Sequence, residues 1–188
     1  MLEWIFRGLS KGRITTRYPL GPEPEHETAF VGPHFSALNE RSRALGRSIH
    51  VRHIDCGSDG SEEWEVQALW NPYYDIQRLG IFLTNSPRHA DVLLVTGPVT
   101  AAMRAPLKRT WAVMPEPKAL IAVGTDACGG GLHGAGDDAV ADEQPTAGGV
   151  DNVLPVDVYV PGSPPTPIAI LHGLLVATGQ AQPAGSGS

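Results

Sequence analysis

Residues 57–65, GSDGSEEWE, have the composition of a loop that surrounds a bound group. The segment follows a strand-like run, and its glycines and serines allow backbone to approach a ligand closely. Its candidate donors are carboxylates, Asp59 and Glu62 among them. Carboxylate oxygens suit Mg²⁺, Ca²⁺ or Mn²⁺, but the spacing lacks the pattern of an EF-hand calcium loop. The segment therefore indicates a ligand loop that carries acids where a soft-metal site would carry thiols.

Cys56 and Cys128 are the only cysteines in the chain. Two cysteines make no disulfide framework, and a reducing, cytosolic location is the default expectation. We interpret each as a small buried residue, because free cysteine commonly packs in that way. Joint ligation of a remnant metal is the weaker alternative. His50 and His53 form an H-x-x-H pattern, but on a strand this odd spacing turns them to opposite faces, which argues against a shared metal.

The elements that must position these residues alternate between strand-like and helix-like runs. The strand-like runs are residues 48–55, 90–98, 118–125 and 154–162, and the helical runs are 62–71, 100–114 and 165–179. Pro106 is expected to kink or interrupt the second helix. Such alternation predicts an α/β domain with a parallel sheet, and continuous apolar strands predict helices on both faces. Ligands of such sheets bind at the carboxyl ends of the strands.

The α/β domain is predicted to span residues 48–179, and the remaining segments differ from it in composition. We predict an amphipathic helix and an extended leader in residues 1–19, a Pro- and Gly-punctuated connector in 20–47, a long Gly- and Asp-rich loop in 129–150, and a disordered tail in 180–188. The terminal helix is interpreted either as folded onto its own domain or as lying on a partner or a membrane surface.

Composition excludes several classes of protein. The chain has 188 residues, of which 41% are hydrophobic, enough for one domain with a real core. Its formal net charge of −6 gives no general attraction to nucleic acid. No run approaches the ~18 consecutive apolar residues of a spanning helix. The first residues mix charged and apolar side chains, unlike a signal peptide.

Separate stretches of the chain resemble, in order, one family of proteins. They are HVRHIDCGSDGSEEWEVQAL, YYDIQRLGIFLTNSPRHADVLLVTGPVT, PEPKALIAVGTDACGGG and PVDVYVPGSPPTP. Together they resemble the small iron–sulfur subunit of energy-converting NiFe hydrogenases and the homologous 20-kDa, or B, subunit of respiratory complex I. The resemblance covers most of residues 1–179, including the leader GRITTRYP. It implies a flavodoxin-like fold with an N-terminal extension.

In these relatives four cysteines hold one 4Fe–4S cluster; in the hydrogenase version two come from a C-x-x-C in the first loop, one from a G-x-C-A loop and one from P-G-C-P-P. Carried over position by position, these cysteines fall on Asp59, Glu62, Asp126 and Ser163. Thiolates, occasionally with histidine, hold such clusters, whereas carboxylates and a hydroxyl suit hard cations. The resemblance therefore implies a degenerate cluster site with no intact cofactor ligands. We expect that the family's cofactor has been lost.

The acids at such a site need hydrogen bonds, cations or raised pKa values if they are buried. We expect a satisfied polar network there, with a hard metal ion or a solvent-filled hollow as alternatives. Arg52, Arg88 and Arg104 are the candidate counter-charges from this chain.

The expected function is that of a structural and coupling subunit of a membrane-associated, complex-I-like, ion-translocating assembly, without catalysis of its own. The resemblance implies a peripheral place on the cytoplasmic side of the membrane. It also implies a hetero-oligomer with a hydrogenase-large-subunit-like (complex I 49-kDa-like) partner and antiporter-like membrane subunits. No nucleic-acid partner is expected.

Two alternatives come from other classes of function. The first is a redox-active hydrogenase or NADH-quinone oxidoreductase small subunit with an atypical iron–sulfur or metal centre, which would use Cys56 and Cys128. The second is a metal-dependent hydrolase that would use Asp59, Glu62 and Asp126. No histidine base or nucleophile constellation is evident for this last reaction.

Overall fold

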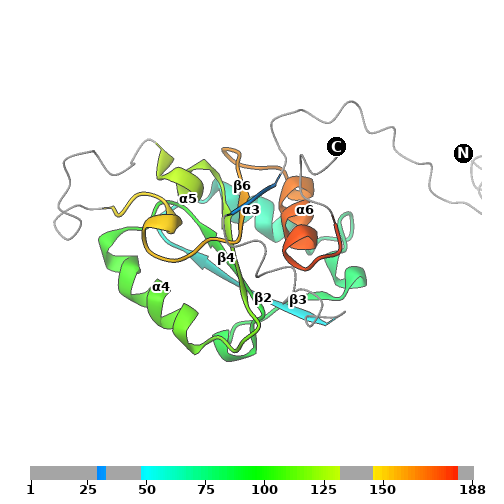
Figure 1. Cartoon of the computed structure of the whole chain (residues 1–188). Coiled ribbons are helices and arrows are strands. Elements are labelled where there is room, and N and C mark those ends of the chain that lie inside the picture. The colour runs from blue at the N-terminus through cyan, green and yellow to red at the C-terminus, as the bar shows by residue number, and fades with distance from the viewer. Residues whose placement is uncertain (1–28, 33–47, 132–145, 182–188) are drawn as a thin grey trace, which may run out of the picture.

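The computed structural model of the chain describes residues 29–32, 48–131 and 146–181 (Figure 1). The helix and leader predicted for residues 1–19 lie outside the described residues. So do most of the predicted connector, residues 132–145 of the long loop and the last residues of the tail.

A single six-stranded sheet forms the centre of the domain. Its strands are β1 (Phe30–Val31), β2 (Ile49–Asp55), β3 (Ile81–Leu83), β4 (Val92–Thr96), β5 (Ala119–Val123) and β6 (Val158–Val160). They lie in the order β1-β6-β5-β4-β2-β3, with β1 antiparallel to β6 and all other pairs parallel. Without β1, this is the 2-1-3-4-5 order of flavodoxin-like folds, so the predicted fold is confirmed.

Helices cover both faces of this sheet, as the apolar strands predict. The α-helices are α3 (Ser61–Ala68), α4 (Ala101–Val113), α5 (Thr125–Gly129) and α6 (Pro167–Ala177); the short 3-10 helices are η1 (Ile76–Leu79), η2 (Pro87–His89) and η4 (Val150–Asn152). One hydrophobic cluster joins α3 and α6 to the sheet, and a second joins α4 and α5 to its other face. The central strands β4 and β5 are buried along their whole length, as expected for strands covered on both sides.

Three elements differ from the prediction. The connector contributes β1, which contacts β6 closely: the N–H of Gly32 donates to the Asp157 carbonyl (2.7 Å), and a Cβ at this glycine would overlap the Val156 carbonyl. The helix α4 continues through Pro106 rather than breaking there, because a proline removes only one hydrogen bond and the helix is held by buried Leu107. The edge strand β3 was not predicted, because a run of three residues is too short to show a period.

Candidate functional site

The first loop folds back at the end of β2, beside the loop that follows β4. Asp55 ends β2, and its Oδ1 accepts hydrogen bonds from the backbone N–H groups of Gly57 and Ser58, both at 2.8 Å. Gly97, after β4, has a φ of 70°, and a Cβ there would overlap the backbone of Ser58. Only glycine therefore suits this position. The contact brings the loops of β2 and β4 together at the point where the strand order reverses, the usual ligand position in such sheets.

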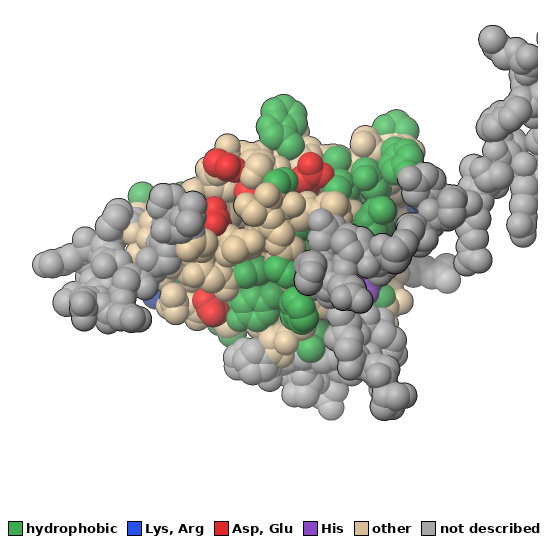
Figure 2. Space-filling view, turned by 90° about the horizontal axis from the view of Figure 1, so that it is seen from above, with side chains coloured by type: hydrophobic (Ala, Val, Ile, Leu, Met, Phe, Trp, Pro, Cys, Tyr) green, Lys and Arg blue, Asp and Glu red, His purple; other side chains and the backbone are tan. Residues whose placement is uncertain are grey.

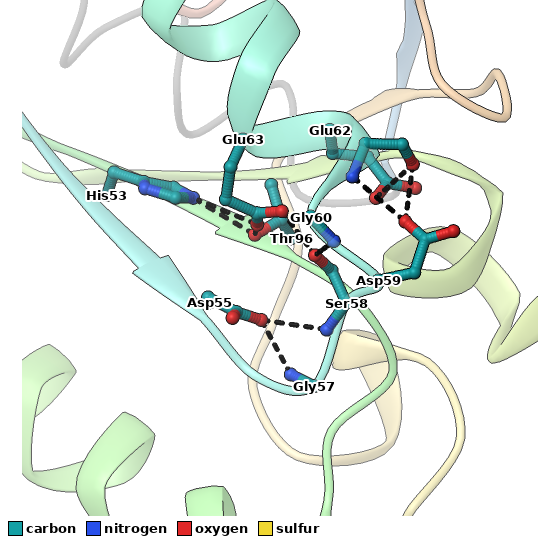
Figure 3. Close-up of polar contacts among 10 residues, drawn as sticks. His53, Asp55, Gly57, Ser58, Asp59, Gly60, Glu62, Glu63 and Thr96 are labelled. Atoms are coloured by element: carbon teal, nitrogen blue, oxygen red, sulfur yellow. Dashed lines mark hydrogen bonds and ion pairs between the residues drawn. The ribbon is translucent and has the colours of Figure 1, made fainter.

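A side-chain network centred on Glu63 holds this loop against the sheet (Figure 3). The Glu63 carboxylate accepts hydrogen bonds from the hydroxyls of Thr96 and Ser58, and Ser58 Oγ accepts from the N–H of Gly60 at 2.9 Å. His53 Nε2 lies 3.0 Å from Thr96 Oγ1 and 3.7 Å from Glu63 Oε1. Since Thr96 gives its one proton to Glu63, it accepts from His53, which places a proton on Nε2. Burial lowers the pKa of His53, although Glu63 opposes this shift.

Asp59 and Glu62 occupy the positions of the two C-x-x-C cysteines, and they differ in their exposure to solvent. Asp59 is exposed, and it accepts hydrogen bonds from the Ser61 hydroxyl (2.6 Å) and N–H (2.9 Å), which lower its pKa. Glu62 is only 2% exposed, and burial raises its pKa. Its Oε2 lies 3.1 Å from the Ser61 hydroxyl, whose one proton goes to Asp59, and its carboxyl packs against Gly124, where a Cβ would lie 2.6 Å from Oε1.

Asp126 and Ser163 lie on two further loops that are hydrogen-bonded to each other. Asp126, in α5, is half-buried, and its carboxyl lies so close to Gly131 that a Cβ there would overlap it. The neighbouring Thr125 donates twice to the Gly162 carbonyl, from its N–H at 2.8 Å and its hydroxyl at 3.1 Å. Ser163 is the next residue along and is exposed. The loops after β2, β5 and β6 therefore meet at one edge of the sheet.

Convergence of the loops does not assemble their carboxylates into a metal site. The described part of the chain holds no group of three or more His, Cys, Asp or Glu residues placed to bind a metal ion. Asp59 instead accepts from the Ser61 N–H and hydroxyl, and Glu62 Oε2 lies 3.1 Å from the same hydroxyl oxygen. The polar network expected at this site stays a prediction, to which these hydrogen bonds would belong.

Two of the arginines suggested as counter-charges lie elsewhere. Arg52 alternates with His53 along β2, so it projects from the face opposite α3. Its Nε is buried without a hydrogen-bond partner. Arg88 is in η2, which precedes β4 and therefore lies at the amino end of the strands. Strand alternation turns Arg52 away from α3 and its Glu62, and strand direction places Arg88 at the opposite end of the strands.

The two cysteines pack with the hydrophobic cluster between the sheet and α4 and α5. Cys56 is fully buried, and Cys128 is partly buried with its Sγ 3.6 Å from the Ala122 carbonyl. Burial raises the pKa of each thiol to about 12. Both are therefore neutral thiols near pH 7, whereas the thiolate is the form that binds metal.

The residues present do not fit a 4Fe–4S cluster. The four positions implied by the resemblance offer carboxylate and hydroxyl oxygens, while such a cluster is held by thiolates. The buried carboxyl of Glu62 moreover packs directly onto the backbone of the third loop, at Gly124. No step of chemistry is therefore assigned to a cluster at this site.

Sequence reasoning missed the network of Glu63, Thr96, His53 and Ser58. The only local signal was a threonine at the end of an otherwise apolar strand and a histidine inside another strand. The network joins residues up to 43 positions apart, so it appears only once the strands are paired.

Comparison with known proteins agrees with this arrangement of loops on a parallel sheet. The model of the NADH ubiquinone oxidoreductase 20 kDa subunit family matches residues 59–177. The chain belongs to this family. The matched region begins at Asp59, within the first loop, and ends at Ala177, the last residue of α6, so it contains all the described α-helices that cover the sheet.

Relatives in the 20 kDa subunit family include subunits of hydrogenases. Formate hydrogenlyase subunit 7 of Escherichia coli is 43% identical over 137 residues, which are 73% of this chain but 51% of that protein. The chain thus matches about half the length of this relative. A probable membrane-bound hydrogenase subunit of Pyrococcus furiosus is 44% identical over 134 residues, 71% of this chain and 75% of that protein.

A solved structure of an archaeal respiratory membrane complex, the membrane-bound sulfane sulfur reductase, contains a chain of similar fold. The TM-score is 0.58 and the identity 28%, over 77% of this chain and 79% of that one. In the described ranges of our chain, no helix has the length and apolar character needed to cross a membrane.

Proposed function

We propose that this chain is an architectural subunit of a membrane-associated, complex-I-like assembly. In this role it occupies the place of an electron-transferring subunit and couples its neighbours mechanically, without carrying a cluster. Support comes from its relatives, which include a formate hydrogenlyase subunit and a membrane-bound hydrogenase subunit, and from the fold it shares with a chain of a respiratory membrane complex.

The observation that carries the proposal is the donor set of the site. Asp59, Glu62, Asp126 and Ser163 offer oxygen alone, and oxygen donors favour hard cations over iron–sulfur clusters. The two available thiols are neutral and pack with the other face of the sheet. An electron relay through this subunit would lack ligands at every family position.

Hydrogen bonds within the chain hold the same loops in shape, so their shape requires no cluster. Asp55 and Glu63 fix the first loop through hydrogen bonds, and Thr125 joins the third loop to the fourth. Retention of the loops without a cofactor is the behaviour expected of a scaffold.

We infer the partners from the family to which the chain belongs, and not from contacts that this chain makes. We propose a hydrogenase-large-subunit-like protein and antiporter-like membrane subunits, with this chain on the cytoplasmic side of the membrane. The assembly would then move ions or solutes with its chemistry supplied by other subunits.

The test is purification of the affinity-tagged full-length chain from its own host, in a mild detergent and under anaerobic conditions. The proposal predicts co-migration on native gels with a large-subunit homologue and polytopic membrane proteins, in constant ratio across preparations. A chain that purifies from the soluble fraction as a monomer would contradict the proposed function.

A further inference from the structure

The outer face of α3 presents a large aromatic side chain to solvent. Trp64 is 72% exposed, although tryptophan is among the residues with most apolar surface to bury. Glu65 follows it in the helix, and exposed Asp59 lies just before the helix. We call Asp59, Trp64 and Glu65 the Trp64 face; Glu63 is excluded, because its carboxylate is turned toward Thr96 and His53 of the sheet. Tryptophan side chains are enriched at protein interfaces.

The segment of sequence that contains Trp64 is acidic and has no lysine or arginine. Between residues 53 and 77 there is no basic side chain except His53, while the segment holds the acids Asp55, Asp59, Glu62, Glu63, Glu65 and Asp75. Of these acids only Glu62 is classed as buried. Figure 2, seen from the side where α5 and the β6–α6 loop lie, shows acidic side chains among hydrophobic ones.

These charges are not neutralised by basic side chains in the described part of the chain. Glu63 forms an ion pair with His53, but burial lowers the pKa of that histidine and so favours its neutral form. The Ser61 hydrogen bonds lower the pKa of Asp59 and keep it ionised. The Trp64 face therefore has a lasting negative charge near neutral pH.

Charge and chemistry select one kind of occupant. A metal ion is disfavoured, because no group of acids in the described ranges is placed to hold one. Anionic lipid and nucleic acid would be repelled by the acids. A protein surface with lysine or arginine would gain from both features, since arginine and tryptophan are enriched at the centres of interfaces and charge complementarity speeds association.

We propose that the Trp64 face docks a partner protein whose surface presents Lys or Arg side chains around an apolar pocket for the indole. The inference rests on the proposed function, because the partner is taken to be a subunit of the same assembly. Trp64 anchors the contact, and the carboxylates around it select a basic partner and reject acidic ones.

The first experiment locates the contact without altering Trp64. A photoreactive p-benzoylphenylalanine replaces exposed Gln67, one turn further along α3, in the full-length chain expressed in its own host. Irradiation of the detergent-solubilised assembly is expected to link this position to one partner subunit, through a peptide from a Lys- or Arg-rich surface. Val113, 39% exposed at the end of α4, provides the matched control position and should give no such product.

The second experiment measures the energetic role of the indole. Trp64→Ala should weaken association with that partner about thirtyfold, the effect of removing a hot-spot residue of ~2 kcal/mol. Trp64→Phe should recover part of the loss, and rising salt should weaken the wild-type contact. Because Trp64 is exposed, both variants should keep the wild-type melting curve.

The outcomes separate this inference from the function on which it rests. An assembly that forms normally with Trp64→Ala, or that gives no crosslink from position 67, would overturn the docking proposal and leave the proposed function standing. A crosslink to a surface without Lys or Arg would overturn it equally. Failure of the wild-type chain to enter any assembly would remove the proposed function, and the docking proposal with it.

Discussion

Glu62 and Glu63 are adjacent in the chain, yet α3 turns them into different surroundings. Glu63 accepts hydrogen bonds from two hydroxyls and lies near His53. Glu62 is buried against Gly124 with the Ser61 hydroxyl beside its carboxyl. A buried carboxyl with few donors is less costly when protonated, which is why its pKa rises. Stability at this site therefore depends on pH through Glu62.

Replacement of Glu62 by glutamine should flatten the pH dependence of folding. The pKa of Glu62 is raised in the folded state above its ordinary value of 4.5. As pH rises through that range, the unfolded chain releases this proton first, so the native state loses stability. Glu62→Gln removes the effect, and its free energy of unfolding should fall less with rising pH than that of the wild type. Urea denaturation at a series of pH values measures this difference.

Glu65→Gln is the matched control, since Glu65 is on the same helix but less buried. Its pH profile should follow the wild type. Parallel profiles for Glu62→Gln and the wild type would show that Glu62 is well solvated, contrary to the structure.

Gly124 is the residue on which the packing of Glu62 depends. Its φ is 91°, and an added Cβ would lie 2.6 Å from Glu62 Oε1. Gly124→Ala should therefore lower the free energy of unfolding by about 1–3 kcal/mol, from backbone strain and displacement of a buried side chain. Gly129→Ala is the control, because a Cβ there meets no atom within 4 Å. Equal stability of the two variants in urea denaturation would refute the proposed contact.

At the scale of elements, periodicity predicted the parallel sheet and its covering helices, because long apolar runs and amphipathic helices carry their own signal. The short edge strands β1 and β3 escaped prediction, since two or three residues show no period. The continuity of α4 through Pro106 could not be predicted either. It depends on packing by residues such as Leu107, which only the folded chain reveals.

Lys118 closes the carboxyl end of α4. Its ammonium donates to the carbonyls of Trp111 (2.9 Å) and Met114 (3.4 Å), and it lies 4.6 Å from the centroid of the Trp111 ring. Lys118→Met should destabilise the domain by about 1–3 kcal/mol, because it removes the ammonium that donates to both carbonyls, of which, in the described part of the chain, only that of Trp111 keeps another donor, the Met114 N–H.

Lys108→Met, at an exposed position of the same helix, is the control and should change the midpoint of thermal unfolding little. Equal midpoints of thermal unfolding for Lys118→Met and Lys108→Met would show that the ammonium does not cap the helix.

At the scale of the whole molecule, the sequence predicted where the site would lie but not how its groups would be arranged. The loops after β2, β5 and β6 do meet, and Thr125 joins two of them. The separate environments of Asp59 and Glu62 depend on the approach of Gly124, a contact between distant parts of the chain. The role of Glu63 likewise requires β2 and β4 to be paired.

The central claim is that this subunit carries no iron–sulfur cluster at its family site, and iron analysis tests it most directly. The full-length chain is purified anaerobically, and iron and acid-labile sulfide are measured per chain, with electron paramagnetic resonance after reduction. A variant with cysteine at residues 59, 62, 126 and 163 is treated identically as the comparison. The account predicts less than about 0.1 iron per wild-type chain and no cluster signal, whereas about four iron and four sulfide per chain with such a signal would contradict it.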